Sequence, residues 1–142
     1  MVISHVAKFK KYHKQKIRIR SVACKLREPI FGTFAIRAKE ASRLTEWHFE
    51  TVQKTLRRSL KKMGYIWFLG NPTIPVSAKP TNIRMGKGKG AVSFWSQMVP
   101  TGSTMFEVGG QNRDFVARAV KGVSKKLPNR VGLAWARLRL HK

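Results

Sequence analysis

One short stretch has residue types and spacing suited to binding a polyanion. Arg84-Met85-Gly86-Lys87-Gly88-Lys89-Gly90 alternates glycine with lysine directly behind an arginine. Glycine suits a segment whose backbone another molecule must approach closely, because it has no side chain in the way. The cations of Arg84, Lys87 and Lys89 could neutralise phosphates lying along that backbone. Taken alone, these seven residues fit a flexible, solvated surface loop equally well.

The composition of the whole chain favours the polyanion. The 142 residues contain 30 Lys and Arg against six Asp and Glu, a formal net charge of +24. Such a charge destabilises a compact monomer unless a polyanion supplies the countercharge, and nucleic acid is the usual one. An anionic membrane surface is the alternative partner. However, the basic residues are spread over the full length, and no run approaches the roughly 18 apolar residues of a spanning helix.

The titratable residues offer little for catalysis or metal binding. Six carboxylates, four histidines and the single Cys24 show no Ser-His-Asp, paired-carboxylate or zinc spacing. We therefore predict no enzyme, no cofactor, no metal and no intramolecular disulfide, in a reducing compartment. Glu107 is expected to pair with a local basic residue, and His13 to contact RNA. An enzyme that binds a phosphate ligand in the glycine loop is the weakest alternative, because a proline-rich segment precedes Gly86-x-Gly88-x-x-Ala91 and a strand pattern follows it.

Hydrophobic patterning predicts the strands that anchor this stretch. Residues 70–83 contain three prolines and are expected to form a long irregular connection into it. The runs 91–98 and 105–108 are expected to pair as an antiparallel hairpin. Further strands are predicted at 31–37, at 65–69 as a buried strand, and within the basic tail 130–142.

Two amphipathic helices are predicted. The first has Thr45 as its N-cap and Gly64 as the residue after its end; the second starts near Asn112 and stops before Pro128. The first helix has a basic face on which only Glu50 offsets the positive charge. Such a face favours contact with an RNA backbone, although basic faces are often only solvated. The apolar stripe of the first helix comprises Phe49, Val52, Leu56, Leu60 and Met63, and its basic face Lys54, Arg57, Arg58, Lys61 and Lys62.

Residues 1–27 are predicted to form a basic arm. They hold nine basic residues and no acid, with aromatic and branched residues interspersed, which suits stacking and packing on RNA. A disordered basic tail is the alternative, and we expect residues 8–20 to order only on RNA. The candidate RNA contacts of the arm are Lys8, Lys10, Lys11, Tyr12, His13, Lys14, Lys16, Arg18 and Arg20.

These motifs, in this order, resemble the bacterial and organellar form of the family of the large-ribosomal-subunit protein numbered sixteen. The resemblance covers roughly residues 8–128, and residues 84–90 match the family's hallmark loop residue for residue. The other matching motifs are Lys8-Phe9-Lys10-Lys11-Tyr12-His13-Lys14, Phe31-Gly32-x-Phe34-x-Ile36-x-Ala38, Gly64-Tyr65-Ile66-Trp67, Lys79-Pro80 and Met105-Phe106-Glu107.

The resemblance implies an α+β fold, a single compact domain over 28–128 with a mixed, mostly antiparallel sheet and two helices on one side. The basic arm and a basic tail, residues 129–142, flank it. The resemblance further implies binding to large-subunit rRNA near the central protuberance, contact with neighbouring ribosomal proteins, and no homo-oligomer. The loop, within the functional segment 70–90, would point toward tRNA in the aminoacyl site, close to the peptidyl-transferase centre. A free-standing nucleic-acid-binding module is the alternative.

Departures from the family pattern indicate a fast-drifting lineage. Gln15 stands where the family has glycine, residues 70–79 lack the family's charges, and nothing after Pro128 resembles it. We therefore expect a mitochondrial ribosome ahead of a bacterial or chloroplast one. Patterned sequence begins as early as Lys8, which leaves little room for a cleaved presequence and would indicate synthesis inside the organelle.

Overall fold

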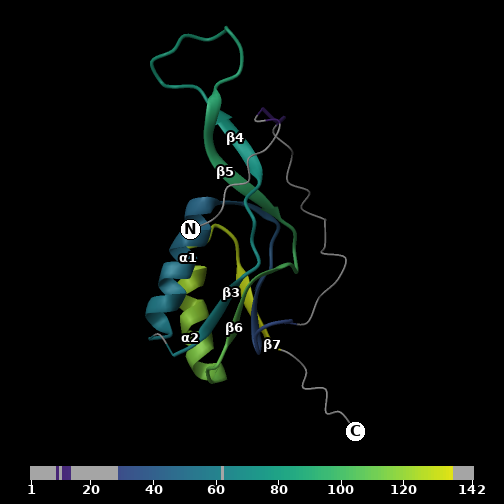
Figure 1. Ribbon diagram of the computed structural model, residues 1–142, viewed down its shortest axis with the longest axis vertical. Helices are drawn as coiled ribbons and strands as arrows, with labels where there is room; N and C mark the ends of the chain where they lie inside the picture. Colours follow the sequence, from purple (N-terminus) through teal and green to yellow (C-terminus); the bar gives the residue numbers. More distant parts are fainter. Residues whose placement is uncertain (1–8, 10, 14–28, 62, 136–142) are drawn as a thin grey trace.

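The computed structural model describes residues 9, 11–13, 29–61 and 63–135. The predicted α+β class is confirmed (Figure 1). The elements, in chain order, are β1 (Phe34–Ala38), β2 (Ser42–Thr45), α1 (Glu46–Ser59), β3 (Tyr65–Phe68), β4 (Ile74–Ala78), β5 (Ala91–Val99), β6 (Thr104–Gly109), α2 (Arg113–Ser124) and β7 (Val131–Trp135).

The strands divide between two sheets, whereas the sequence led us to expect one. A four-stranded sheet has the order β3-β6-β1-β7 and a three-stranded sheet has the order β2-β5-β4. Each of these neighbouring pairs is antiparallel. Both helices lie side by side on one side of the four-stranded sheet, as expected (Figure 1).

The predicted hairpin between 91–98 and 105–108 is wrong. β5 pairs with β2 and β4, and β6 pairs with β1 and β3, so the chain changes sheet between the two strands. The connecting turn is bonded to β1: Gly102 N–H donates to the Ala38 carbonyl at 2.7 Å, and Ala38 N–H donates to the Ser103 carbonyl at 3.0 Å. Alternation identifies a strand but carries no information about its partner.

The predicted irregular connection 70–83 contains β4, which the prolines concealed. Pro75 lies inside this strand and is buried. Because β4 is at the edge of its sheet, a residue without a backbone N–H can be accommodated there. The pairing with β5 also shifts register between Val76 and Ser77. β4 and β5 therefore form a hairpin that projects from the domain and carries residues 79–90 at its tip (Figure 1).

The hydrophobic core lies between the helices and the four-stranded sheet. Phe49 of α1 packs against Phe106 of β6 with ring centroids 6.1 Å apart. Burying side chains of this size contributes about 1.5–3 kcal/mol each, which holds the helices to the sheet. The main buried residues are Phe49, Val52, Leu56 and Leu60 on the α1 side, Val116, Val120 and Val123 of α2, and Ile36, Phe106 and Val108 of the sheet.

The ends of the helices follow the prediction in part. Thr45 is the N-cap of α1, and its backbone N–H donates to Nδ1 of His48 at 3.1 Å. The helix ends at Ser59, several residues before Gly64, because Lys61 already adopts the left-handed conformation at φ 48°. Met63 is consequently 67% exposed and does not continue the apolar stripe.

The remaining predicted elements are present. The second helix begins after Asn112 and ends at Ser124, before Pro128, and β7 is the strand predicted within the tail. The strand predicted at 31–37 begins only at Phe34. The strand predicted at 65–69 is not buried throughout, since β3 is an edge strand and Tyr65 is 71% exposed.

Candidate nucleic-acid interface

The tip of the β4–β5 hairpin presents the glycine-lysine stretch to solvent. Residues 79–89 are all exposed. Gly86, Lys87 and Gly88 have φ angles of 97°, 52° and 87°, so three successive residues adopt left-handed backbone. A Cβ at Gly86 or Gly88 would meet nothing within 4 Å. These two glycines are therefore required by the backbone conformation, and the space beside them is open.

Gly90 has a different role from the other two glycines. A Cβ at this position would lie 2.6 Å from the Ala78 carbonyl carbon and 2.9 Å from the Lys79 nitrogen. The absence of a side chain at Gly90 thus lets β4 and β5 approach each other closely at the base of the loop, which we call its neck. Nζ of Lys79 also donates to the Gly86 carbonyl across the loop. The close approach at Gly90 and the hydrogen bond from Lys79 therefore hold the loop in shape.

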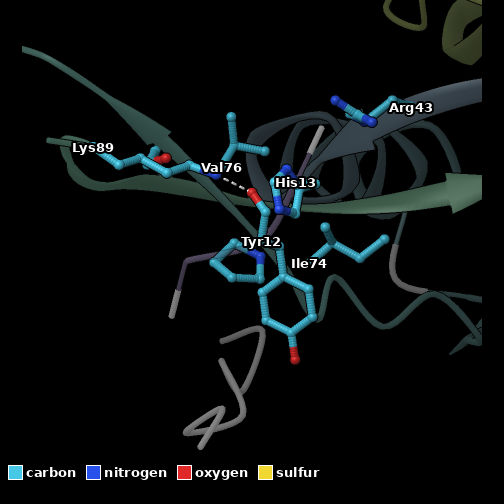
Figure 2. A pocket seen from close by; sticks show the side chains of 8 residues that line it. Tyr12, His13, Arg43, Ile74, Val76 and Lys89 are labelled. Atoms are coloured by element: carbon cyan, nitrogen blue, oxygen red, sulfur yellow. Dashed lines mark hydrogen bonds between the residues drawn. The ribbon is translucent and has the colours of Figure 1, made fainter. Parts of the chain in front are cut away.

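Part of the predicted arm lies against the hairpin stem. Nζ of Lys89 donates to the backbone carbonyl of Tyr12 (Figure 2). Tyr12 and His13 help to line a cavity of about 90 Å³ that Arg43, Lys89 and β4 complete. The other predicted RNA contacts of the arm lie outside the described residues: Lys8, Lys10, Lys14, Lys16, Arg18 and Arg20.

The cations of the loop therefore differ in what they contact. Lys89 has its ammonium group on a carbonyl of the arm. The side chains of Arg84 and Lys87 are exposed and make no hydrogen bond or ion pair to any described residue. A phosphate group at the tip would meet these two cations without displacing a protein partner.

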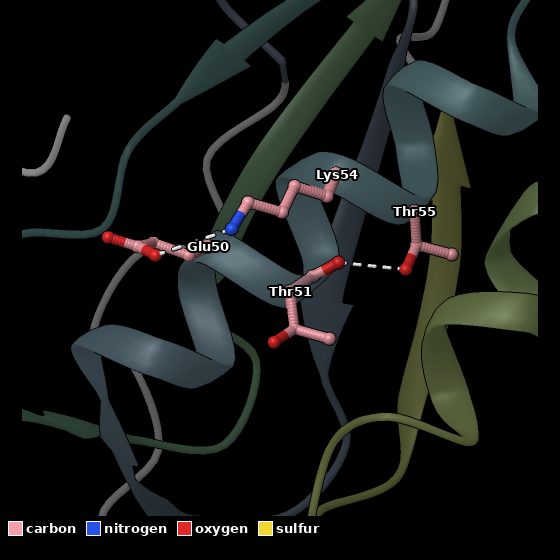
Figure 3. Close-up of polar contacts among 4 residues, drawn as sticks. All are labelled: Glu50, Thr51, Lys54 and Thr55. Atoms are coloured by element: carbon pink, nitrogen blue, oxygen red, sulfur yellow. Dashed lines mark hydrogen bonds and ion pairs between the residues drawn. The ribbon is translucent and has the colours of Figure 1, made fainter.

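The basic face of α1 is exposed as predicted. Lys54, Arg57, Arg58 and Lys61 all lie at the surface, and Lys62 is outside the described residues. Glu50 forms an ion pair with Lys54 at 3.7 Å, one helical turn away, and Thr55 Oγ1 donates to the Thr51 carbonyl at 2.8 Å (Figure 3). Such an exposed pair contributes no more than about 0.5 kcal/mol.

The remaining cations of this face are free for a larger partner. Within the described ranges, Arg57, Arg58 and Lys61 have no acidic partner. The C-terminal end of α1 lies at the opposite end of the domain from the loop (Figure 1). The two basic regions cannot contact one phosphate together, but an extended or folded polyanion can reach both.

Among the described residues, Glu107 pairs with backbone N–H groups and with no basic side chain, contrary to the prediction. Its carboxylate is buried and accepts hydrogen bonds from three successive backbone N–H groups, those of Ile30 at 3.1 Å, Phe31 at 2.7 Å and Gly32 at 2.9 Å. Backbone N–H groups satisfy a buried carboxylate as well as a cation does. An acid inside an otherwise apolar strand was the one sequence signal of this contact.

Two further classes of site can be assessed from the part of the chain that the structure describes. In these ranges no helix has the length and apolar character needed to cross a membrane. No three His, Cys, Asp or Glu side chains there are grouped to hold a metal ion.

Comparison with known proteins identifies the family. A family model described as ribosomal protein L16p/L10e matches residues 7–133, which include the loop and both helices. The large ribosomal subunit protein uL16 of Sinorhizobium fredii (strain NBRC 101917 / NGR234) is 39% identical over 118 residues, covering 82% of this chain and 86% of that protein. The uL16 proteins of Chelativorans sp. (strain BNC1) and Paracoccus denitrificans (strain Pd 1222) are 40% and 39% identical over 119 and 121 residues. These matches cover 83% and 85% of this chain and 87% of each relative.

These matches confirm the family resemblance and, because the family consists of structural ribosomal proteins, the prediction that the chain is not an enzyme. The basic loop and helix face thus stand on a scaffold shared with bacterial ribosomal proteins. The chain belongs to the ribosomal protein L16p/L10e family.

Proposed function

We propose that the protein is a structural constituent of the large ribosomal subunit, binds large-subunit rRNA and takes part in translation. The observation that carries this proposal is the placement of exposed cations without acidic partners at opposite ends of one domain, on α1 and on the loop. A module that docks on a single groove needs only one basic surface. The names of the bacterial relatives, each a large-subunit protein, support the same assignment.

The two basic regions have different proposed partners. The arm and the face of α1 bind rRNA near the central protuberance, and the loop of residues 84–90 reaches toward tRNA in the aminoacyl site. The loop assignment is supported by the exposure of Arg84 and Lys87, which have no described protein partner. It is also supported by the projection of the hairpin away from the core (Figure 1).

The ribosome of a mitochondrion is the proposed location, on the strength of the sequence departures noted above. The bacterial relatives do not distinguish it from a bacterial ribosome. Separation of organelles from cytosol, followed by sedimentation in high salt, tests both points. The protein is expected with mitochondrial large subunits. Recovery in small-complex fractions alone would contradict the ribosomal assignment, and recovery with large subunits outside mitochondria would contradict only the location.

A matched pair of variants tests the loop. Arg84→Ala combined with Lys87→Ala removes two cations that we expect to make charge-assisted contacts, each contributing about 1.5–3 kcal/mol. Subunits carrying it should assemble but bind aminoacyl-tRNA at least about tenfold more weakly. Lys125→Ala with Lys126→Ala removes the same charge from exposed positions beyond α2 and should leave tRNA binding unchanged. Loss of the loop variant from the subunit would instead show that the loop anchors rRNA.

A further inference from the structure

Three aromatic side chains, Phe31, Tyr65 and Trp67, lie together outside the core; we name them the aromatic platform. Phe31 stacks on Trp67 with ring centroids 6.3 Å apart and planes 22° apart, and Tyr65 lies 6.0 Å from Trp67. Phe31 is 57% and Tyr65 is 71% exposed. Side chains alternate across β3, and Ile66 packs on the core, so Tyr65 and Trp67 belong to the opposite face of the sheet. The platform therefore stands on the sheet face away from the helices.

The platform is built on the buried Glu107. This residue is the cross-strand neighbour of Trp67, and its carboxylate binds the backbone N–H of Phe31. Gly32 lies directly on β6, since a Cβ there would be 2.7 Å from the Val108 carbonyl oxygen. The segment that carries Phe31 is therefore fixed through its backbone, and the ring is held over Trp67 before any partner arrives. Such pre-organisation lowers the entropic cost of binding.

Core packing does not explain these rings. With more than half of their surface exposed, Phe31 and Tyr65 contribute little to burial. Large apolar groups gathered on a monomer surface are uncommon and usually mark an interaction site. Ile30, adjacent in the chain, is also 65% exposed. The platform thus has the character of a contact surface.

The surroundings of the platform suit a nucleotide. Next to Tyr65, an open hollow of about 590 Å³ is lined by Thr33, Met63, Gly110, Gln111 and Asn112. The hollow is open to solvent, and its hydroxyl and amide side chains can bond to the edge of a base. Proteins usually recognise single-stranded RNA by stacking aromatic rings on the faces of its bases and by hydrogen-bonding polar groups to the edges of those bases.

Charge favours RNA over an apolar protein surface. Arg57 lines a second hollow together with Ile66, on the helix-side face of β3. Because β3 is the edge strand of its sheet, only the edge of this strand separates the basic face of α1 from the platform on the other face. The acid beneath the platform, Glu107, is 1% exposed and bonded to backbone N–H groups, so its oxygens do not lie on the surface that a phosphate would contact. The net charge of +24 acts in the same direction.

We propose that the aromatic platform stacks on unpaired bases of large-subunit rRNA, with the adjoining phosphates directed toward Arg57 and Lys61. This inference rests on the proposed rRNA-binding function. It adds a base-contacting surface separate from the loop and from the cations of α1.

Two RNA probes with the same phosphates test the proposal on the full chain. One is a twelve-nucleotide oligoadenylate, and the other is an abasic chain of equal length. Tyr65→Ala should weaken oligoadenylate binding by about fivefold or more, since stacking on one base contributes about 1–3 kcal/mol. It should leave abasic binding and the salt dependence unchanged. Tyr65→Phe keeps the ring and should bind normally, and Ile30→Ala, which removes an exposed apolar side chain without a ring from a position beside Phe31, should have no effect.

The alternatives give different results. Equal losses on both probes, or an equal loss with Ile30→Ala, would overturn the stacking proposal, and the second result would indicate an apolar contact. Failure of the unaltered protein to bind either probe would instead contradict the proposed rRNA-binding function. Short-wavelength ultraviolet crosslinking of assembled large subunits supplies an independent measurement. Tyr65 or Trp67 should attach to an rRNA nucleotide, and attachment of the platform to another protein would overturn the proposal.

Discussion

Glu107→Gln is the most direct test of how the sheet face is built. The carboxylate accepts bonds from three N–H groups at 2.7–3.1 Å, and each charge-assisted bond contributes about 1.5–3 kcal/mol. Glutamine retains one acceptor oxygen but turns an NH₂ group toward the remaining N–H donors. We expect a loss of about 2–4 kcal/mol in the free energy of unfolding. For a chain of this length, that loss lowers Tm by roughly 6–12 °C.

The assay is urea and thermal unfolding of the purified chain, with Glu40→Gln as the matched control. Glu40 pairs with Arg130 at 3.5 Å at the surface, so the same chemical change there should cost no more than about 0.5 kcal/mol. Glu107→Gln should also alter tryptophan fluorescence, because the segment that holds Phe31 over Trp67 loses its anchor. Equal stabilities of the two variants would refute the reasoning and would mean that packing alone holds the segment.

Three other predictions concern the hairpin and the basic helix. Gly90→Ala should accelerate amide exchange throughout β4 and β5, because a Cβ cannot fit against the β4 backbone. Lys89→Met should accelerate exchange in the hairpin stem by removing its bond to the arm, whereas Lys87→Met, which changes the same charge without losing a contact to a described residue, should not. Arg57→Ala with Arg58→Ala should reduce the slope of log affinity against log salt by about 1.4 on single-stranded RNA, measured by fluorescence anisotropy; an unchanged slope would exclude phosphate contacts at both positions.

Local signals in the sequence predicted the helices well. Helical spacing of Phe49, Val52 and Leu56 placed α1, and Thr45 marked its start, because amphipathicity and capping depend on residues within a few turns. The end of α1 was misplaced because Lys61 adopts a conformation usually reserved for glycine. The exposure of the loop followed from its composition, since glycine and lysine at the tip of a hairpin need no packing partner.

The features that the sequence did not predict depend on contacts between distant parts of the chain. β5 appeared to form a hairpin with β6 because β4, its true neighbour, contains Pro75 and was assigned to a loop. The contacts of Glu107 with residues 30–32 and of Lys89 with Tyr12 each join positions at least 75 residues apart. Spacing within a segment cannot predict such contacts, and these contacts hold the aromatic platform in place and join the arm to the hairpin.

The contact between the arm and the hairpin links the two proposed RNA-binding regions physically. A hairpin of two strands is only marginally stable in water, and β4 and the first half of β5 extend beyond β2, which pairs only with residues 96–99 of β5 (Figure 1). The projecting part is held by the neck at Gly90 and by Lys89 on the Tyr12 carbonyl. Any partner that fixes Tyr12 therefore restricts the hairpin, and a partner that fixes the hairpin restricts the arm to the same degree, because coupling free energies are reciprocal. Under the proposed function, rRNA bound at the arm would in this way set the direction of the loop.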